Sequence, residues 1–175
     1  DNAKIEAIYS DVSQLRFFDV ANQAIVDPIN TFNELSSQPS PYKALDSTEW
    51  AKLLIDGEGL MVFGSLTVSN YQDETAIAEA VITNLDSNLL AGGFDLKQSK
   101  YVGFIVSANE EVLEKLPAKN INYAAAIVQE QAGTPKSMFR GVYITDDKED
   151  HVRVYSCFAG LSLPMSRVEA LKKEA

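Results

Sequence analysis

Hydrophobic residues near the start of the chain recur with the period of an α-helix. Five of them stand three or four positions apart and so share one face: Phe18, Ala21, Ile25, Ile29 and Phe32. The pattern predicts one long helix over residues 11–37. Three further apolar residues widen this face, so we expect the helix to be buried on more than one side: Phe17, Val20 and Ala24.

Polar residues and prolines indicate where this helix begins and ends. Asp11, with Gln14 three positions later, is a candidate N-terminal cap. The run of serine and proline at residues 36–41 predicts the end of the helix. Pro28 lies inside the pattern, and we expect a kink there because proline removes one main-chain hydrogen bond.

The remainder of the chain alternates between helical and strand-like patterns. Helices are expected over residues 47–55, 73–90, 109–116 and 120–132, and strands over 60–68, 101–106, 139–145 and 152–158. Gly57 and the pair Gly92-Gly93 are expected to end the first two of these helices. The polar loop 146–150 joins the last two strands, which predicts an antiparallel hairpin.

These elements predict an α+β fold, in which a long core helix precedes a mixed or antiparallel four-stranded sheet packed with helices. The chain is divided into the core helix with its flanks (1–40), the main domain (41–165) and a charged tail (166–175). It opens on Asp1 and not on methionine, so we expect it to be a piece of a longer protein.

Composition narrows the classes of function. With 46% hydrophobic residues, the 175-residue chain can bury a proper core. A formal net charge of −10 disfavours binding to nucleic acid or to an anionic membrane. No apolar run is long enough to span a membrane, and no secretory signal opens the chain. We therefore expect a cytoplasmic protein with no nucleic-acid partner and no membrane insertion.

Metal and thiol chemistry have little support in the sequence. Cys157 is the one cysteine, so no internal disulfide can form, and its apolar surroundings predict a buried, inert thiol. One cysteine and one histidine, His151, cannot build a His/Cys zinc site. We expect His151 to lie on the surface and the chain to hold no metal.

Two carboxylates, Asp46 and Glu49, stand three positions apart at the start of a predicted helix. In a cleft beside a phosphate, such a pair could orient a water molecule and accept its proton. The same spacing is that of a capping box, in which Asp46 caps the helix and Glu49 bonds back to it. The two roles are compatible, because a cap uses one oxygen of each carboxylate.

An aromatic side chain and an amide, Phe18 and Asn22, stand four positions apart on the first helix and so share a face. The ring could stack on a purine while the amide reads its polar edge, since an amide both donates and accepts. The alternative is a core aromatic beside an ordinary polar residue. No glycine-rich phosphate loop occurs in the chain, so we expect it to bind no nucleotide tightly alone.

In order and spacing, these motifs resemble the tubulin/FtsZ family of polymerising GTPases. In that family the central helix presents an aromatic and an asparagine to guanine, and an Asn-x-Asp-x-x-Asp/Glu loop meets the GTP of the neighbouring subunit. Here the matching residues are Phe18, Asn22, Asp46 and Glu49. One residue departs from the pattern, because Ala44 stands where the family has the leading asparagine.

The resemblance implies that residues 41–165 are the C-terminal, activation-type domain of such a GTPase. Asp46 and Glu49 would be its catalytic pair, and Phe18 and Asn22 would bind nucleotide. GTP and Mg²⁺ would belong to the full-length protein, and neither is expected in this chain, which would be inactive alone. Its partners would be its own N-terminal GTP-binding domain, preceding Asp1, and other copies in a filament.

Two other classes of function stay open from the sequence. The chain could be a non-enzymatic interaction or assembly domain that has kept the fold without hydrolysis, which Ala44 favours. It could also be a free-standing enzyme acting on a small molecule, although only the carboxylate pair supports that reading. Among filament functions, the sequence does not distinguish cell division from plasmid segregation or another role.

Overall fold

The computed structural model describes residues 10–13, 16–87 and 92–174. Its helices are α2 (Phe17–Ser36), α3 (Ser47–Ala51), the π-helical turn η1 (Lys52–Asp56), α4 (Ala76–Ser87), the 3-10 turn η2 (Leu96–Gln98), α5 (Glu110–Lys115), α6 (Ala118–Gln131) and α7 (Met165–Glu174). Its strands are β1 (Leu60–Val68), β2 (Tyr101–Ala108), β3 (Ser137–Ile144) and β4 (Val152–Leu161).

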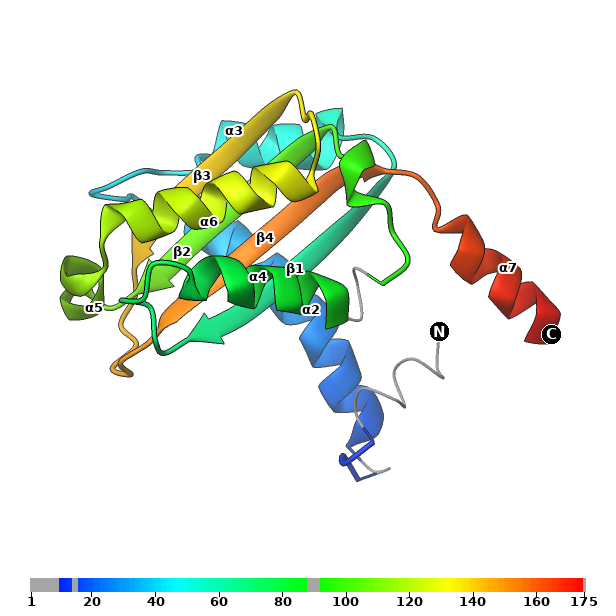
Figure 1. Cartoon of the computed structure of the whole chain (residues 1–175), viewed down its shortest axis with the longest axis horizontal. Coiled ribbons are helices and arrows are strands. Elements are labelled where there is room, and N and C mark those ends of the chain that lie inside the picture. Colours follow the sequence, from blue (N-terminus) through cyan, green and yellow to red (C-terminus); the bar gives the residue numbers. More distant parts are fainter. Residues whose placement is uncertain (1–9, 14–15, 88–91, 175) are drawn as a thin grey trace.

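The four strands form one mixed sheet in the order β1-β4-β2-β3. Strand β4 pairs antiparallel with both β1 and β2, whereas β2 and β3 are parallel. Helices α4 and α6 cover one face of the sheet, and α2 and α3 lie behind the other (Figure 1). The predicted α+β architecture with a mixed four-stranded sheet is therefore confirmed.

The predicted hairpin between the last two strands is wrong. Strands β3 and β4 are not neighbours, because β2 lies between them. Helices α5 and α6 form a crossover that returns the chain parallel to β2, which puts β3 at the edge. Strand β4 is buried on both faces along most of its length, and such a strand belongs in the middle of a sheet.

Helix α2 differs from its prediction at the N-terminal end. It begins at Phe17, after an N-cap, Arg16, that makes no side-chain hydrogen bond. Asp11 lies in a turn before the helix, and Gln14, its expected partner in the cap, lies outside the described residues. The helix continues through Pro28, which is buried, and ends at Ser36 as expected.

Burial along α2 is also less than predicted. The buried residues lie on one face and mostly in the C-terminal half: Ala21, Pro28, Phe32, Leu35 and Ser36. Phe18 is 62% exposed and Ile29 is 37% exposed, although both were expected in the buried stripe. Ala24 is exposed as well, so within this chain the helix is not buried on more than one side.

The other elements follow their predictions with shifts at the ends. Helix α4 begins three residues later than expected, and residues 88–91 before Gly92-Gly93 lie outside the described residues. Strand β2 extends to Ala108, and Pro117 separates α5 from α6. The second helix changes from α to π hydrogen bonding after Ala51 and ends at Gly57, as expected.

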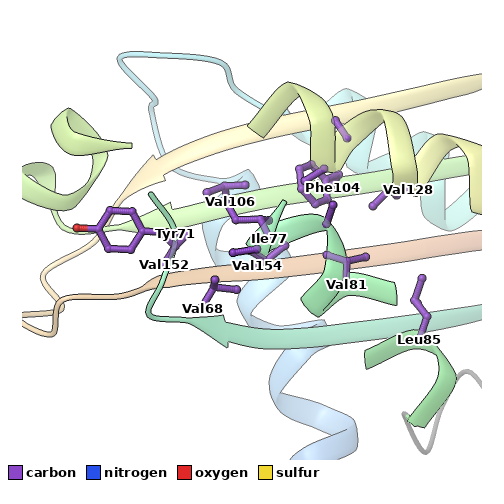
Figure 2. Packing of buried hydrophobic residues seen from close by; sticks show 14 of the residues in the cluster. Val68, Tyr71, Ile77, Val81, Leu85, Phe104, Val106, Val128, Val152 and Val154 are labelled. Atoms are coloured by element: carbon purple, nitrogen blue, oxygen red, sulfur yellow. The ribbon is translucent and has the colours of Figure 1, made fainter. Parts of the chain in front are cut away.

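Each face of the sheet has its own core. On one side, valines and other apolar residues of β1, β2 and β4 pack against α4, α5 and α6; Figure 2 shows Val68, Val106, Val152 and Val154 beside Ile77 and Val81. On the other side, Phe32 of α2 and Trp50 of α3 pack with side chains of the sheet in an aromatic cluster. Its members from the strands include Phe63, Phe139 and Tyr143.

Cys157 belongs to this second core and is fully buried, as predicted, and burial raises the pKa of its thiol far above its usual range. Helix α7 lies beyond the end of β4, away from the sheet (Figure 1). Across the described ranges, the structure has no helix with both the length and the apolar character needed to cross a membrane.

Candidate functional site

The carboxylates of Asp46 and Glu49 form a complete capping box at the start of α3. The Glu49 main-chain N–H donates to Asp46 Oδ1 at 2.8 Å, and the Asp46 N–H donates to Glu49 Oε2 at 3.3 Å. The capping interpretation of this pair is therefore confirmed. The remaining oxygens, Asp46 Oδ2 and Glu49 Oε1, have no hydrogen-bond partner among the described residues, and Asp46 is exposed to solvent.

Leu45, just before the carboxylates, is clamped to the sheet by the hydroxyl of Tyr143. That hydroxyl donates to the Leu45 carbonyl at 2.7 Å and accepts from the Leu45 N–H at 2.9 Å. Both residues are fully buried, and burial raises the pKa of the Tyr143 phenol. A buried hydroxyl that satisfies both main-chain groups of one residue fixes the position of the loop relative to β3.

Gly141 makes this close approach possible. A Cβ atom at Gly141 would lie 2.4 Å from the Tyr143 ring and 3.1 Å from the Leu45 nitrogen. Any larger residue would push the tyrosine off the loop. Glycine is needed here for space, and its freedom of backbone conformation is not required.

The segment before Leu45 runs along the outer side of β3. The Val142 N–H donates to the Lys43 carbonyl at 2.7 Å, and the Ser40 hydroxyl donates to the Val142 carbonyl. These bonds tie residues 40–43 to the edge strand. The loop that carries the carboxylates therefore has a defined start as well as a clamped centre.

Helix α3 is held from the other side by Trp50. Its ring stacks on Phe32 of α2 with centroids 5.2 Å apart and meets Phe63 of β1 edge-on. Its indole N–H donates to the side-chain oxygen of Asn33 at 3.2 Å. The loop is thus anchored to the sheet through Leu45 and to the end of α2 through Trp50. Ala44, just before Leu45, is exposed.

Phe18 and Asn22 lie at the opposite end of α2, and both are exposed. Phe18 contacts Phe17 edge-on, with ring centroids 5.2 Å apart. Asn22 and the last residue of α2 are separated by about 20 Å along the helix axis at 1.5 Å per residue. The structure therefore does not bring this pair together with Asp46 and Glu49, and the role of each pair stays a prediction.

One cluster of charged and polar side chains was not predicted from the sequence. His151, expected on the surface, is half-buried, with its Nε2 3.1 Å from Asp147 Oδ2 and 3.2 Å from the Arg153 Nε. The Glu149 main-chain N–H and Arg153 hold the pKa of Asp147 below its usual value. The spacing Asp-x-x-x-His was its only signal. No group of three His, Cys, Asp or Glu in the described ranges is arranged to hold a metal ion.

The structure thus places a capped carboxylate loop beside the C-terminal end of α2, which lies on one face of a mixed four-stranded sheet. A family model described as "Tubulin/FtsZ-like protein TubZ-like, C-terminal domain" matches residues 31–172. This chain belongs to that family. The comparison with curated proteins gave no match.

Solved structures agree on the fold. GDP-form protofilaments of TubZ from Bacillus thuringiensis serovar israelensis match with a TM-score of 0.81 at 17% identity, over 99% of this chain and 46% of that one. The structure of a type III plasmid segregation TubZ matches with a TM-score of 0.81 at 16% identity, over 98% of this chain and 46% of that one. An empty FtsZ dimer from M. jannaschii gives 0.69 at 20% identity, over 91% and 43%. The chain spans less than half of each of these structures.

Proposed function

We propose that this chain is the C-terminal half of a polymerising GTPase and that its loop 46–49 acts on the GTP of the adjacent subunit in a filament. One observation carries this proposal. Asp46 and Glu49 are fixed by their mutual cap, by Tyr143 and by Trp50, yet each keeps one carboxylate oxygen without a hydrogen-bond partner in the part of the chain that the structure describes. A loop this well supported presents two bases at a constant position.

The chemistry asked of the loop is positioning. A water molecule bound between Asp46 Oδ2 and Glu49 Oε1 would be oriented by both, and either carboxylate could accept its proton as it attacks the terminal phosphate. Mg²⁺ would neutralise charge on the phosphates when it is bound with GTP. In this proposal its ligands come from the nucleotide and the N-terminal domain.

The nucleotide of each subunit would be contacted at the other end of α2. The exposed ring of Phe18 is available to stack on guanine, and the amide of Asn22 to read its edge. A central helix with one pair at each end would then belong to two sites at once, its own GTP at the N-terminal end and the next GTP beyond the C-terminal end.

The relatives support assembly and one cellular role. The Bacillus thuringiensis protein is described in protofilaments, and another TubZ structure is titled for type III plasmid segregation. Because the matching family model is TubZ-like, we propose plasmid segregation ahead of cell division as the role of the whole protein.

The alternative is an assembly domain that does not hydrolyse nucleotide. Two observations favour it: Ala44 replaces the asparagine that the family motif carries, and one oxygen of each carboxylate is already used in the cap. In that case Asp46 and Glu49 would only begin a helix, and the clamped loop would be a rigid surface for a neighbour.

The deciding experiment is GTP turnover by the full-length protein, measured against its concentration. Asp46→Asn and Glu49→Gln are the useful variants, because asparagine still caps a helix and glutamine can still bond back to it. Specific activity should rise steeply with concentration in the parent protein. In the variants it should fall by about a hundredfold or more, with sedimentable filaments retained.

Glu130→Gln is the matched control, since it removes one exposed carboxylate from α6, away from the loop. Unchanged turnover in assembled Asp46→Asn and Glu49→Gln filaments would contradict the catalytic role of the loop. The alternative function, an assembly domain that takes no part in hydrolysis, would then be favoured. A separate titration tests the proposal that the phosphate-binding residues lie outside this chain. Calorimetry on the 175-residue chain should detect no tight GTP binding. Micromolar affinity would show that the chain itself has a phosphate site.

A further inference from the structure

Strand β3 leaves part of its outer edge without main-chain partners. It is an edge strand of the sheet, and its one partner among the described strands is β2. The Thr145 N–H points inward to Ala108, whereas the Val142 N–H points outward to Lys43. Because main-chain groups alternate along a strand, those of Arg140 and Met138 also point outward. Residues 40–43 bond only to Val142 on this edge, so no described strand lies beside the main-chain groups of Met138 and Arg140.

A groove runs along this open edge. Helix α6 forms one wall with Asn122, Ala126 and Gln129, which stand three and four positions apart, and β3 forms the other with Met138 and Arg140. The hollow between them has a volume of about 410 Å³. The small alanine side chain on the helix leaves room for a main chain to lie against the strand.

The groove is positively charged although the protein as a whole carries a formal charge of −10. Three cations line it and no carboxylate does: Lys43, Lys136 and Arg140. The Arg140 guanidinium donates to the neutral amide of Asn122 at 3.4 Å. None of the three belongs to an ion pair between described residues.

An apolar slot continues the groove toward Val142. It has a volume of about 250 Å³ and shares Lys43, Asn122 and Arg140 with the groove. Its inner wall includes Phe104 and Leu116, which are buried. A slot of this size takes one apolar side chain of a bound segment.

We propose that the open edge of β3 binds an extended, acidic segment of another protein as an added strand. Main-chain bonds to Met138 and Arg140 would supply affinity, as in other cases where a peptide extends a sheet. The three cations would select carboxylate-bearing segments and repel a second basic edge. An apolar residue of the segment would enter the slot beside Phe104.

A second copy of this chain is the poorer source of that segment. Its densest acidic run is the loop 146–150, and this loop is tied down within its own fold. Asp147 pairs with Arg153 at 2.9 Å, Asp150 accepts from the Tyr71 hydroxyl at 2.8 Å, and the Asn109 amide donates to the Glu149 carbonyl at 3.0 Å. Pairing as a strand would require all three contacts to break.

The test uses the 175-residue chain and a synthetic peptide of about seven residues, a typical strand length, with alternating glutamate and valine. Two matched peptides accompany it: one with lysine in place of glutamate, and one with the central valine replaced by proline, which cannot donate its main-chain N–H. Binding is followed by nuclear magnetic resonance, together with hydrogen exchange at the Met138 and Arg140 amides. The acidic peptide should bind and slow exchange at both amides, and neither matched peptide should do so.

Variants then separate charge from edge pairing. Lys136→Gln combined with Arg140→Gln should weaken binding of the acidic peptide by about tenfold or more, since two charge-assisted contacts are lost. Lys148→Gln removes a cation outside the groove and should leave the affinity unchanged. Neither altered side chain in the double variant is fully buried, so the fold should be retained.

Three results would overturn the proposal. The lysine peptide could bind as tightly as the acidic one. The peptide could bind while both amides continue to exchange rapidly. Both amides could become protected with rising concentration of the unliganded chain, which would assign the edge to a second copy. Because none of these measurements involves nucleotide, they stand or fall independently of the GTPase proposal.

Discussion

The two ends of helix α2 carry similar residues in opposite surroundings. At the C-terminal end Phe32 is fully buried between Trp50 and Phe63, and Asn33 accepts from the Trp50 indole. At the N-terminal end Phe18 is 62% exposed and Asn22 has solvent beside it. The aromatic side chain thus belongs to the core at one end and lies on the surface at the other, whereas both amides are exposed and only that of Asn33 bonds to a core side chain.

This difference shows which end of the helix stays uncovered within this chain. The uncovered part of an apolar helix stripe is a surface that a partner or a ligand can cover. In the proposed function that partner is the N-terminal GTP-binding domain with its nucleotide. The predictions below test the two ends of α2 and the loop beside its C-terminal end.

The largest effect is expected from Phe32→Ala. Removing a fully buried aromatic ring leaves a cavity beneath Trp50 and should lower the free energy of unfolding by about 3–5 kcal/mol. Urea unfolding followed through the fluorescence of Trp50, the single tryptophan, measures the loss. A decrease below about 1 kcal/mol would mean that this end of the helix is not packed as described.

A smaller loss is expected from Tyr143→Phe. The change keeps the ring but leaves the buried N–H and C=O of Leu45 without their partner, at a cost of about 1–3 kcal/mol. Hydrogen exchange at the Leu45 amide should accelerate more than exchange elsewhere in the sheet. Tyr155→Phe is the control, because its hydroxyl has no hydrogen bond among the described residues, and it should change neither quantity appreciably.

Removal of the helix cap comes next. Asp46→Ala should cost about 1 kcal/mol, whereas Asp46→Asn should cost only a few tenths, because asparagine caps nearly as well. Chemical denaturation of both variants, run side by side, gives the comparison. Equal losses in the two would show that the charge of Asp46, and not its cap, stabilises α3.

The smallest effect is expected from Phe18→Ala. The ring is 62% exposed, and Phe17 is its one aromatic neighbour among the described residues, so the free energy of unfolding of this chain should change by less than about 0.5 kcal/mol. The same change in the full-length protein should weaken GTP binding, if Phe18 stacks on guanine as proposed. A large loss of stability in the isolated chain would place Phe18 in a core instead.

Local patterns in the sequence were sufficient for most elements. The largely apolar run from Leu60 to Val68 placed β1 at its observed bounds, and Pro117 separated α5 from α6 as expected. The capping box at Asp46 and Glu49 was also readable, because its hydrogen bonds join residues three positions apart. Such features depend on neighbours along the chain, so the sequence alone is enough to state them.

Only the tertiary structure decided which strands meet and which faces are covered. The polar loop 146–150 suits a hairpin, yet β4 inserts between β1 and β2 because its apolar residues need cover on both faces. The stripe on α2 predicted burial at Phe18 as firmly as at Phe32, and only the second is covered within this chain. The clamp of Tyr143 on Leu45 joins residues almost a hundred positions apart, and no local pattern encodes a contact of that range.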